Sequence, residues 1–235
     1  MSLFGVPVIY GIKPHTSETV PSHNLGTVGV DNAGRRFRYV LAGEALVVGN
    51  VIQSKAENTS DQGLAVAAAA IGAKELTTTS TVTVSANEYA GGYIVVTITP
   101  GLGHSYRIKS HPAATAAVVV LTLEDPIVVA LTTDSRIDLV ANPFSNVIQN
   151  PTTFSSNAVG VACFAIPSGS YGWIQSGGIA GVLSDAGTTV GQSVVASNGT
   201  AGSVEDVAST TQQIIGVAAA GIASGENGAI FLTID

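Results

Sequence analysis

The chain has 235 residues, of which 46% are hydrophobic and only 11% are charged, and its formal net charge is −7. This length fits one large all-β domain or two smaller ones, and the acidic balance excludes the basic footprint that nucleic-acid binding requires of a whole chain. Because no run of 18 apolar residues occurs, and the first residues have no basic region followed by an apolar one, we predict neither a membrane association nor a secretory signal.

Charge is distributed unevenly along the chain. All nine Lys and Arg residues and all four His residues lie at or before Arg136, and the 99 residues that follow carry six carboxylates and no cation. A segment without imidazole or cation has few groups for acid–base, metal or phosphate chemistry. We therefore predict a non-enzymatic protein without a cofactor.

Residues 1–34 are predicted to form an extended N-terminal arm. Pro7, Pro14 and Pro21 recur at equal spacing among glycines; proline removes a ladder donor and glycine loosens the chain, so little regular structure is expected. Short extended pieces are expected at 6–12 and 26–30. An apolar arm is costly to leave in water, so we expect it to lie on another surface; the alternative is a locally packed N-terminal meander.

Residues 35–145 are predicted to form a central β-sandwich or barrel. Short runs with a period of two, rich in branched side chains, recur up to residue 140. The glycines at 101 and 103 are expected to close a hairpin between 93–98 and 104–110. Only the stretch 64–73 is also compatible with a helix.

A small C-terminal β-barrel is predicted over 150–235. The stretch 142–157 is rich in Asn, Ser, Thr and Pro, and we place a domain boundary there. Short strands separated by glycine-containing turns, one of them Gly177-Gly178, are typical of a small barrel or sandwich. We expect Trp173 in its core, and strands at 159–166, 172–175, 180–183, 193–196, 214–219 and 229–234.

Candidate reactive groups are few. Cys163 stands in an apolar strand and is predicted to be a buried, inert thiol rather than a nucleophile. The histidines His15, His23, His104 and His111 lack the paired spacing of zinc ligands. An enzyme would instead require a pocket with a titratable group of shifted pKa, for which the surroundings of His104 and His111 are the candidates.

The clearest charge cluster is Arg35-Arg36-Phe37-Arg38-Tyr39. Interleaved aromatic residues are typical of single-strand nucleic-acid platforms, but a strand period places both rings on the face opposite Arg36 and Arg38. We therefore predict no direct nucleic-acid contact. Two interpretations stay open: a polar edge that docks on an acidic protein partner, or a solvated strand face that discourages edge pairing.

Three blocks of residues carry a resemblance to a known family. They are 24–29 with 34–43, 88–93 with 106–112, and a C-terminal set that comprises Gly160-Val161, Tyr171-Gly172-Trp173 through Gly178, Gly191-Gln192-Ser193-Val194-Val195 and Ile215-Gly216-Val217-Ala218. Together they resemble virion structural proteins of tailed bacteriophages, in particular head decoration (cement) proteins. The C-terminal set is similar to a small β-barrel in which a "YGW" strand, a "G-(E/D/Q)-x-V" turn and an "IGVA" strand recur.

The resemblance implies a function in assembly and no catalytic residues. It implies a protein that is assembled in the host cytoplasm, binds the outer capsid surface of the virion, and stabilises the shell by bridging subunits of the major capsid protein. It also implies a homo-oligomer, either a dimer or a trimer. The alternative is a tail, baseplate or host glycan-binding component of the virion. The candidate capsid contacts are Val6, Val8, Tyr10, Arg35, Arg36 and Arg38.

Overall fold

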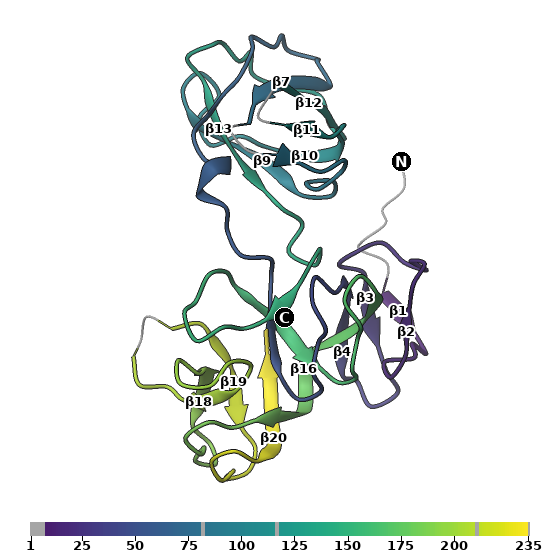
Figure 1. Cartoon of the computed structure of the whole chain (residues 1–235), viewed down its shortest axis with the longest axis vertical. Helices are drawn as coiled ribbons and strands as arrows, with labels where there is room; N and C mark the ends of the chain where they lie inside the picture. Colours follow the sequence, from purple (N-terminus) through teal and green to yellow (C-terminus); the bar gives the residue numbers. More distant parts are fainter. Residues whose placement is uncertain (1–7, 81–82, 116–117, 210–211, 235) are drawn as a thin grey trace. The chain divides into compact units, whose positions relative to one another are not determined.

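The computed structural model describes residues 8–80, 83–115, 118–209 and 212–234. The chain divides into two compact units (Figure 1): unit 1 consists of Met1–Ala56 and Pro143–Asp235, and unit 2 consists of Glu57–Asn142. Among the described residues the only helical element is the 3-10 turn η1 (Thr59–Asp61), so the predicted all-β class is confirmed. None of this described part forms a helix with the length and apolarity needed to cross a bilayer.

Unit 2 is an insertion in unit 1, which corrects the predicted division into 1–34, 35–145 and 150–235. The boundary after residue 142 falls at the start of the predicted boundary stretch 142–157. The other boundary lies after residue 56, whereas the prediction placed it after residue 34. The reason is long-range pairing: β4 (Arg36–Leu41) pairs antiparallel with β16 (Tyr171–Leu183), and β5 (Val51–Gln53) pairs with β15 (Ala158–Ala162). A period of two reveals a strand in the sequence but not its partner.

Unit 1 contains one 12-stranded sheet, whose main path runs β1-β3-β4-β16-β20-β19-β17-β18. Four further strands lie off this path: β2 and β15 pair with β16, β5 pairs with β15, and β14 pairs with β5. The bounds of the strands not yet given are β1 (Val8–Tyr10), β2 (Ser17–Glu18), β3 (Val28–Val30), β14 (Ile148–Gln149), β17 (Ser193–Ala196), β18 (Val204–Asp206), β19 (Ile214–Ala218) and β20 (Asn227–Thr233).

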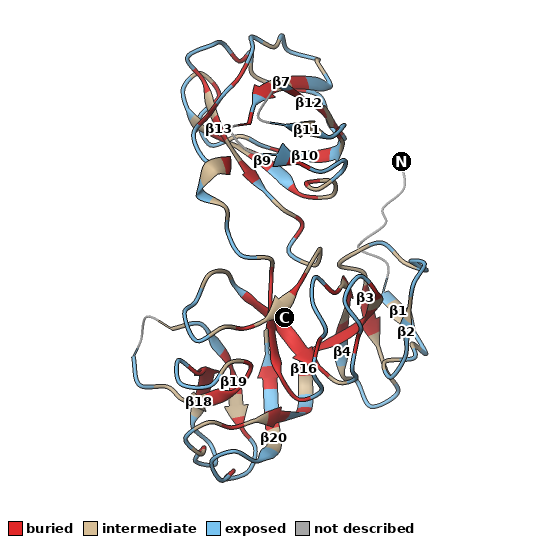
Figure 2. Ribbon diagram, in the orientation of Figure 1, coloured by how far each residue is buried: buried red, intermediate tan, exposed pale blue. Residues whose placement is uncertain are grey.

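The C-terminal part of this sheet closes into a small barrel, as predicted. The second half of β16 pairs with β20, then β19, β17 and β18 follow in order. Strand β18 returns to the end of β16 at the Ser184–Val204 bridge, where the N–H of Asp185 donates to the carbonyl of Val204 at 3.0 Å. Val182, Val194 and other fully buried aliphatic side chains fill the interior, and Figure 2 shows buried residues along these strands.

Strand β16 is continuous, which corrects the prediction of two strands separated by a turn at Gly177-Gly178. Gly178 has φ +82°, and the pairing with β4 shifts register between Gln175 and Gly177, so the glycine pair forms a bulge. The buried Gln175 amide donates to the carbonyls of Gly177 at 3.0 Å and Ile179 at 2.8 Å. A bulge bends a strand without ending it, so β16 pairs with β4 before this point and with β20 after it.

Residues 8–34 are packed on unit 1, which corrects the prediction of an extended arm. Strand β1 pairs in parallel with β3, and β2 pairs antiparallel with β16. Ile12 packs against a buried cluster of Phe37, Tyr39 and Trp173. The alternative of a locally packed meander therefore describes this segment, because burial against aromatic rings removes its apolar surface from water.

Unit 2 is a nearly closed six-stranded barrel with the order β6-β13-β9-β10-β12-β7. The two ends of this order approach each other at the Val66–Thr78 bridge, and the N–H of Ala67 donates to the carbonyl of Thr77 at 2.9 Å. The predicted hairpin between β9 and β10 is confirmed. The stretch 64–73 forms β6 and bridges rather than a helix. The strand bounds are β6 (Leu64–Ala65), β7 (Glu75–Thr79), β8 (Thr83–Val84), β9 (Tyr93–Ile98), β10 (Ser105–Ser110), β11 (Ala114–Thr115), β12 (Val118–Leu123) and β13 (Arg136–Val140).

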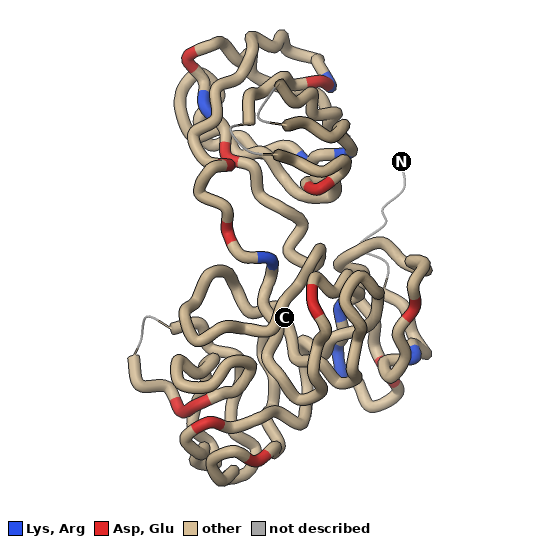
Figure 3. The backbone as a smooth tube through the Cα atoms, viewed as in Figure 1, with Lys and Arg blue, Asp and Glu red and all other residues tan. Residues whose placement is uncertain are grey.

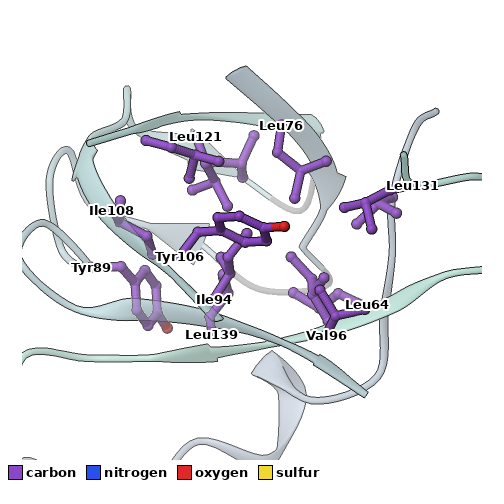
Figure 4. Packing of buried hydrophobic residues seen from close by; sticks show 14 of the residues in the cluster. Leu64, Leu76, Tyr89, Ile94, Val96, Tyr106, Ile108, Leu121, Leu131 and Leu139 are labelled. Atoms are coloured by element: carbon purple, nitrogen blue, oxygen red, sulfur yellow. The ribbon is translucent and has the colours of Figure 1, made fainter. Parts of the chain in front are cut away.

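The interior of unit 2 is its own hydrophobic core. Figure 4 shows the ring of Tyr106 between Leu76 and Leu121 on one side and Ile94 and Val96 on the other. These aliphatic side chains are at most 1% exposed. The Tyr106 hydroxyl accepts the N–H of Val128 at 3.2 Å, so its polar end is satisfied. A separate core of this kind is what an inserted domain needs in order to fold by itself.

Candidate docking site

A cleft of about 470 Å³ lies on unit 1 beside the bulge of β16. Three segments line it: the start of β4 with the turn before it, the bulge itself, and the end of β20. These segments are far apart in the sequence and meet only because β16 changes its pairing partner here. The cleft is therefore a product of tertiary structure.

The two glycines of the bulge leave room for the arginine side chains that cross them. A Cβ at Gly177 would lie 3.3 Å from the Cβ of Arg36, and one at Gly178 would lie 3.2 Å from the Cγ of Arg35. Gly178 also has the left-handed φ that L side chains disfavour. Limited space explains the glycine at position 177, and limited space together with the positive φ explains the glycine at position 178.

Two of the three predicted arginines are engaged within unit 1. The Nε of Arg35 donates to the Asp31 carboxylate at 2.8 Å, and its guanidinium lies 5.4 Å from the centre of the Phe37 ring. Burial acts to raise the pKa of Asp31, but hydrogen bonds from Arg35 and Ala33 outweigh it and the net pKa is lowered. These bonds fix the turn between β3 and β4.

Arg38 is engaged as well, whereas Arg36 is exposed. The Nη1 of Arg38 donates to the carbonyl of Gly26 at 3.0 Å, and its guanidinium lies 5.4 Å from the centre of the Phe144 ring. Within residues 8–80, 83–115, 118–209 and 212–234, no carboxylate forms an ion pair with Arg36. Arg36 is thus the arginine of this group that can serve an incoming partner.

Two exposed apolar side chains lie on the other side of the cleft. Ile179 of β16 and Phe231 of β20 are cross-strand partners and are 47% and 50% exposed. An apolar pair of this size beside a free cation suits a protein segment that carries both an apolar and an acidic side chain. Sequence reasoning missed both residues, because nothing local distinguishes them from other strand residues.

The alternation predicted for the arginine strand is confirmed. Arg36 is exposed, and Phe37 and Tyr39 are at most 1% exposed. Buried rings are not available for stacking on nucleic-acid bases. Hydroxyl groups of Ser22 and Tyr39 bond the Glu18 carboxylate and lower its pKa, which ties β2 to β4.

A second exposed surface lies at the edge formed by β1. This strand ends the main path of the sheet, and among the described strands it pairs with β3 alone. Val8 is 42% exposed and Tyr10 is 76% exposed, while Val6 lies outside the described residues. An edge strand with exposed apolar side chains can accept a further strand from another chain.

The two histidines named as enzyme candidates have structural contacts in unit 2. His111 is buried, and its Nε2 accepts the N–H of Tyr89 at 3.0 Å. Burial, and then the hydrogen-bonded Asp61 carboxylate, raise the pKa of Tyr89. The Nδ1 of His104 lies 3.0 Å from the carbonyl oxygen of Gly101 in the hairpin. A raised pKa keeps the Tyr89 hydroxyl protonated at neutral pH, and in that form it cannot accept a proton as a general base.

Cys163 is half-buried just after β15. Burial raises the pKa of its thiol to about 11, so it stays protonated at neutral pH and is a poor nucleophile. The thiol lies 3.3 Å from the carbonyl oxygen of Pro14, which it satisfies as a weak donor. No group of three His, Cys, Asp or Glu side chains in the described ranges is arranged to hold a metal ion. Neither the comparison with protein-family models nor the search of curated proteins finds a match to this chain.

Proposed function

We propose that this chain is a non-enzymatic virion structural protein of a tailed bacteriophage that binds the outer capsid surface and stabilises the shell by bridging major capsid subunits. The observation that carries the proposal is the edge of the sheet at β1, where Val8 and Tyr10 are exposed. A strand of a capsid subunit that adds to this edge would gain main-chain hydrogen bonds and cover both side chains.

Modest contacts suffice for such a function. Full burial of one large apolar side chain contributes about 1.5–3 kcal/mol, so Val8 and Tyr10 together support a weak individual contact. Many copies on one lattice convert weak contacts into a stable coat, because each later contact forms at a high effective concentration. The proposed protein acts from the virion exterior as a small homo-oligomer. Arg36 is a further proposed contact, whereas Arg35 and Arg38 are engaged inside unit 1.

The proposal is tested by co-sedimentation with expanded capsids that lack this protein. The double variant Val8→Asp/Tyr10→Asp places charge on the β1 edge, and we expect its binding to fall at least about tenfold. Val48→Asp is the matched control, because Val48 is 56% exposed on the same unit but lies outside β1. Undiminished binding of the double variant would contradict the proposed edge, and localisation of the protein on the tail in virion density would favour the tail or baseplate alternative.

A further inference from the structure

The loop between β16 and β17 forms an acidic knob, which we define as residues 184–192 with Glu205 and Asp206 of β18. Its exposed apolar side chain is Val190, at 63% exposure. The N–H of the preceding Thr189 donates to both carboxylate oxygens of Asp206, at 3.1 and 3.2 Å, so a negative charge stands close to Val190 in the chain. Hydrogen bonds therefore hold this loop in a defined shape.

Further carboxylates surround the same loop. The hydroxyl of Ser197 donates to Asp185 at 2.7 Å and to Glu205 at 3.4 Å. Hydrogen bonds from Thr200 and then Ser197 lower the pKa of Asp185, so it is ionised at neutral pH. This part of unit 1 contains no cation: Figure 3 shows red without blue along β17–β20 and blue at β4.

The knob and the cleft complement each other. The cleft offers Arg36 without an internal partner beside the apolar pair Ile179 and Phe231, and the knob offers Val190 beside the Asp206 carboxylate. The cleft volume, about 470 Å³, accommodates a side chain with its adjoining backbone. Apolar contact and opposite charge are thus matched on two surfaces of one chain.

The knob of one molecule lies far from its own cleft. Along the β16–β20 ladder, Gly177 at the cleft pairs with Thr233, and Leu183 at the base of the knob pairs with Asn227. Six residues of strand separate these two positions, which corresponds to roughly 20 Å. Since both are built on the same packed barrel, the knob can reach only the cleft of another molecule.

We propose that the cleft at the β16 bulge receives the acidic knob of a second copy of this chain, with Val190 against Ile179 and Phe231 and the knob carboxylates against Arg36. The contact joins two different surfaces, so repetition closes it as a dimer with two reciprocal contacts or as a trimer with three. This inference rests on the proposed function, whose homo-oligomer it describes in terms of residues.

Sedimentation velocity of the full chain over a range of concentrations tests the contact. Wild type is expected to self-associate at about 0.1 M NaCl and less at about 1 M, because the Debye length falls from about 10 Å to about 3 Å. Val190→Lys opposes Arg36, and Arg36→Glu opposes the knob carboxylates, so each variant should raise the dissociation constant at least about tenfold. The control Val48→Lys should associate as wild type does, because Val48 lies in neither surface.

Combining the variants distinguishes this contact from non-specific association. The double variant Val190→Lys/Arg36→Glu pairs opposite charges again and should regain association. An equimolar mixture of the two single variants combines a native knob with a native cleft, and the changed knob with the changed cleft, so it should associate more strongly than either variant alone. Unchanged near-ultraviolet circular dichroism checks that each variant is folded.

The outcomes separate this inference from the proposed function. A monomeric wild type, single variants that associate like wild type, or a double variant that stays monomeric would overturn the knob-to-cleft contact. A monomer that still sediments with capsids overturns this inference alone. An oligomer that does not sediment with capsids overturns the proposed function alone.

Discussion

Trp173 shows how one residue connects segments that are distant in the sequence. Its ring centre lies 5.2 Å from that of Tyr39 in β4 and 5.4 Å from that of His23, and Phe37 completes the buried cluster. The sequence predicts burial of Trp173 within a C-terminal core, and the residue is only 5% exposed. Its partners, however, come from the first 40 residues, so this core belongs to both parts of unit 1.

Replacement of Trp173 by alanine is expected to destabilise unit 1 by about 3–5 kcal/mol, because it leaves a cavity among aromatic rings. Urea denaturation followed by circular dichroism measures the change. Phe231→Ala provides the control, since that ring is 50% exposed and its loss should cost less than about 1 kcal/mol. Equal midpoints for the two variants would show that the cluster contributes little.

The bulge is the feature of β16 that matters most at the level of elements. Because of the bulge, the first half of this 13-residue strand pairs with β4 and β15, and the second half pairs with β20. The amide of Gln175 bonds the two carbonyls that the bulge would otherwise leave unpaired. The candidate cleft exists because of this bend.

Gly178→Ala should therefore destabilise the protein more than Gly169→Ala does. Both glycines have positive φ, at +82° and +74°, so each substitution should cost about 1–2 kcal/mol through backbone strain. Only at position 178 does the new Cβ also approach a neighbour, the Cα of Arg35 at 3.4 Å and its Cγ at 3.2 Å, whereas no atom lies within 4 Å at Gly169. Comparison of the two urea midpoints isolates this contact; equal losses would mean that the bulge tolerates a side chain.

At the scale of the whole molecule, unit 2 is inserted into unit 1, and in each unit the strands on either side of the insertion point pair with each other. In unit 1, Gln53 pairs with Ile148 across the insertion point, and in unit 2, Leu64 pairs with Ile137. Each unit also has its own buried core. Both units therefore have the features of independently folding domains.

A chain in which residues 57–142 are replaced by a short Gly-Ser linker is expected to fold, and so is the isolated segment 57–142. In each protein the strands next to the cut pair with each other, so only a short loop has to be closed on folding. The entropic cost of closing that loop is small. Near-ultraviolet circular dichroism and cooperative urea unfolding of both proteins measure this. A shortened chain that lacks a cooperative transition would show that unit 1 depends on the insertion.

The sequence by itself determined the all-β class and the position of most strands. The strands predicted at 193–196 and 214–219 follow from short apolar runs between glycine-containing turns, and the hairpin between β9 and β10 follows from the alternation of β10 after a glycine pair. The alternation of Arg36 with Phe37 follows in the same way. Local steric preference and hydrophobic periodicity suffice for such predictions.

Only the tertiary structure decided which strands pair, and everything at the candidate site depends on that. The pairing of β4 with β16 makes unit 2 an insertion, packs the N-terminal segment on a core, and turns the glycine pair at 177–178 into a bulge. Arg35 and Arg38 differ from Arg36 because their side chains bind Asp31 and the carbonyl of Gly26 inside unit 1. The pairing of β4 with β16 joins residues more than 100 positions apart, and no local pattern in the sequence encodes the energy of such contacts.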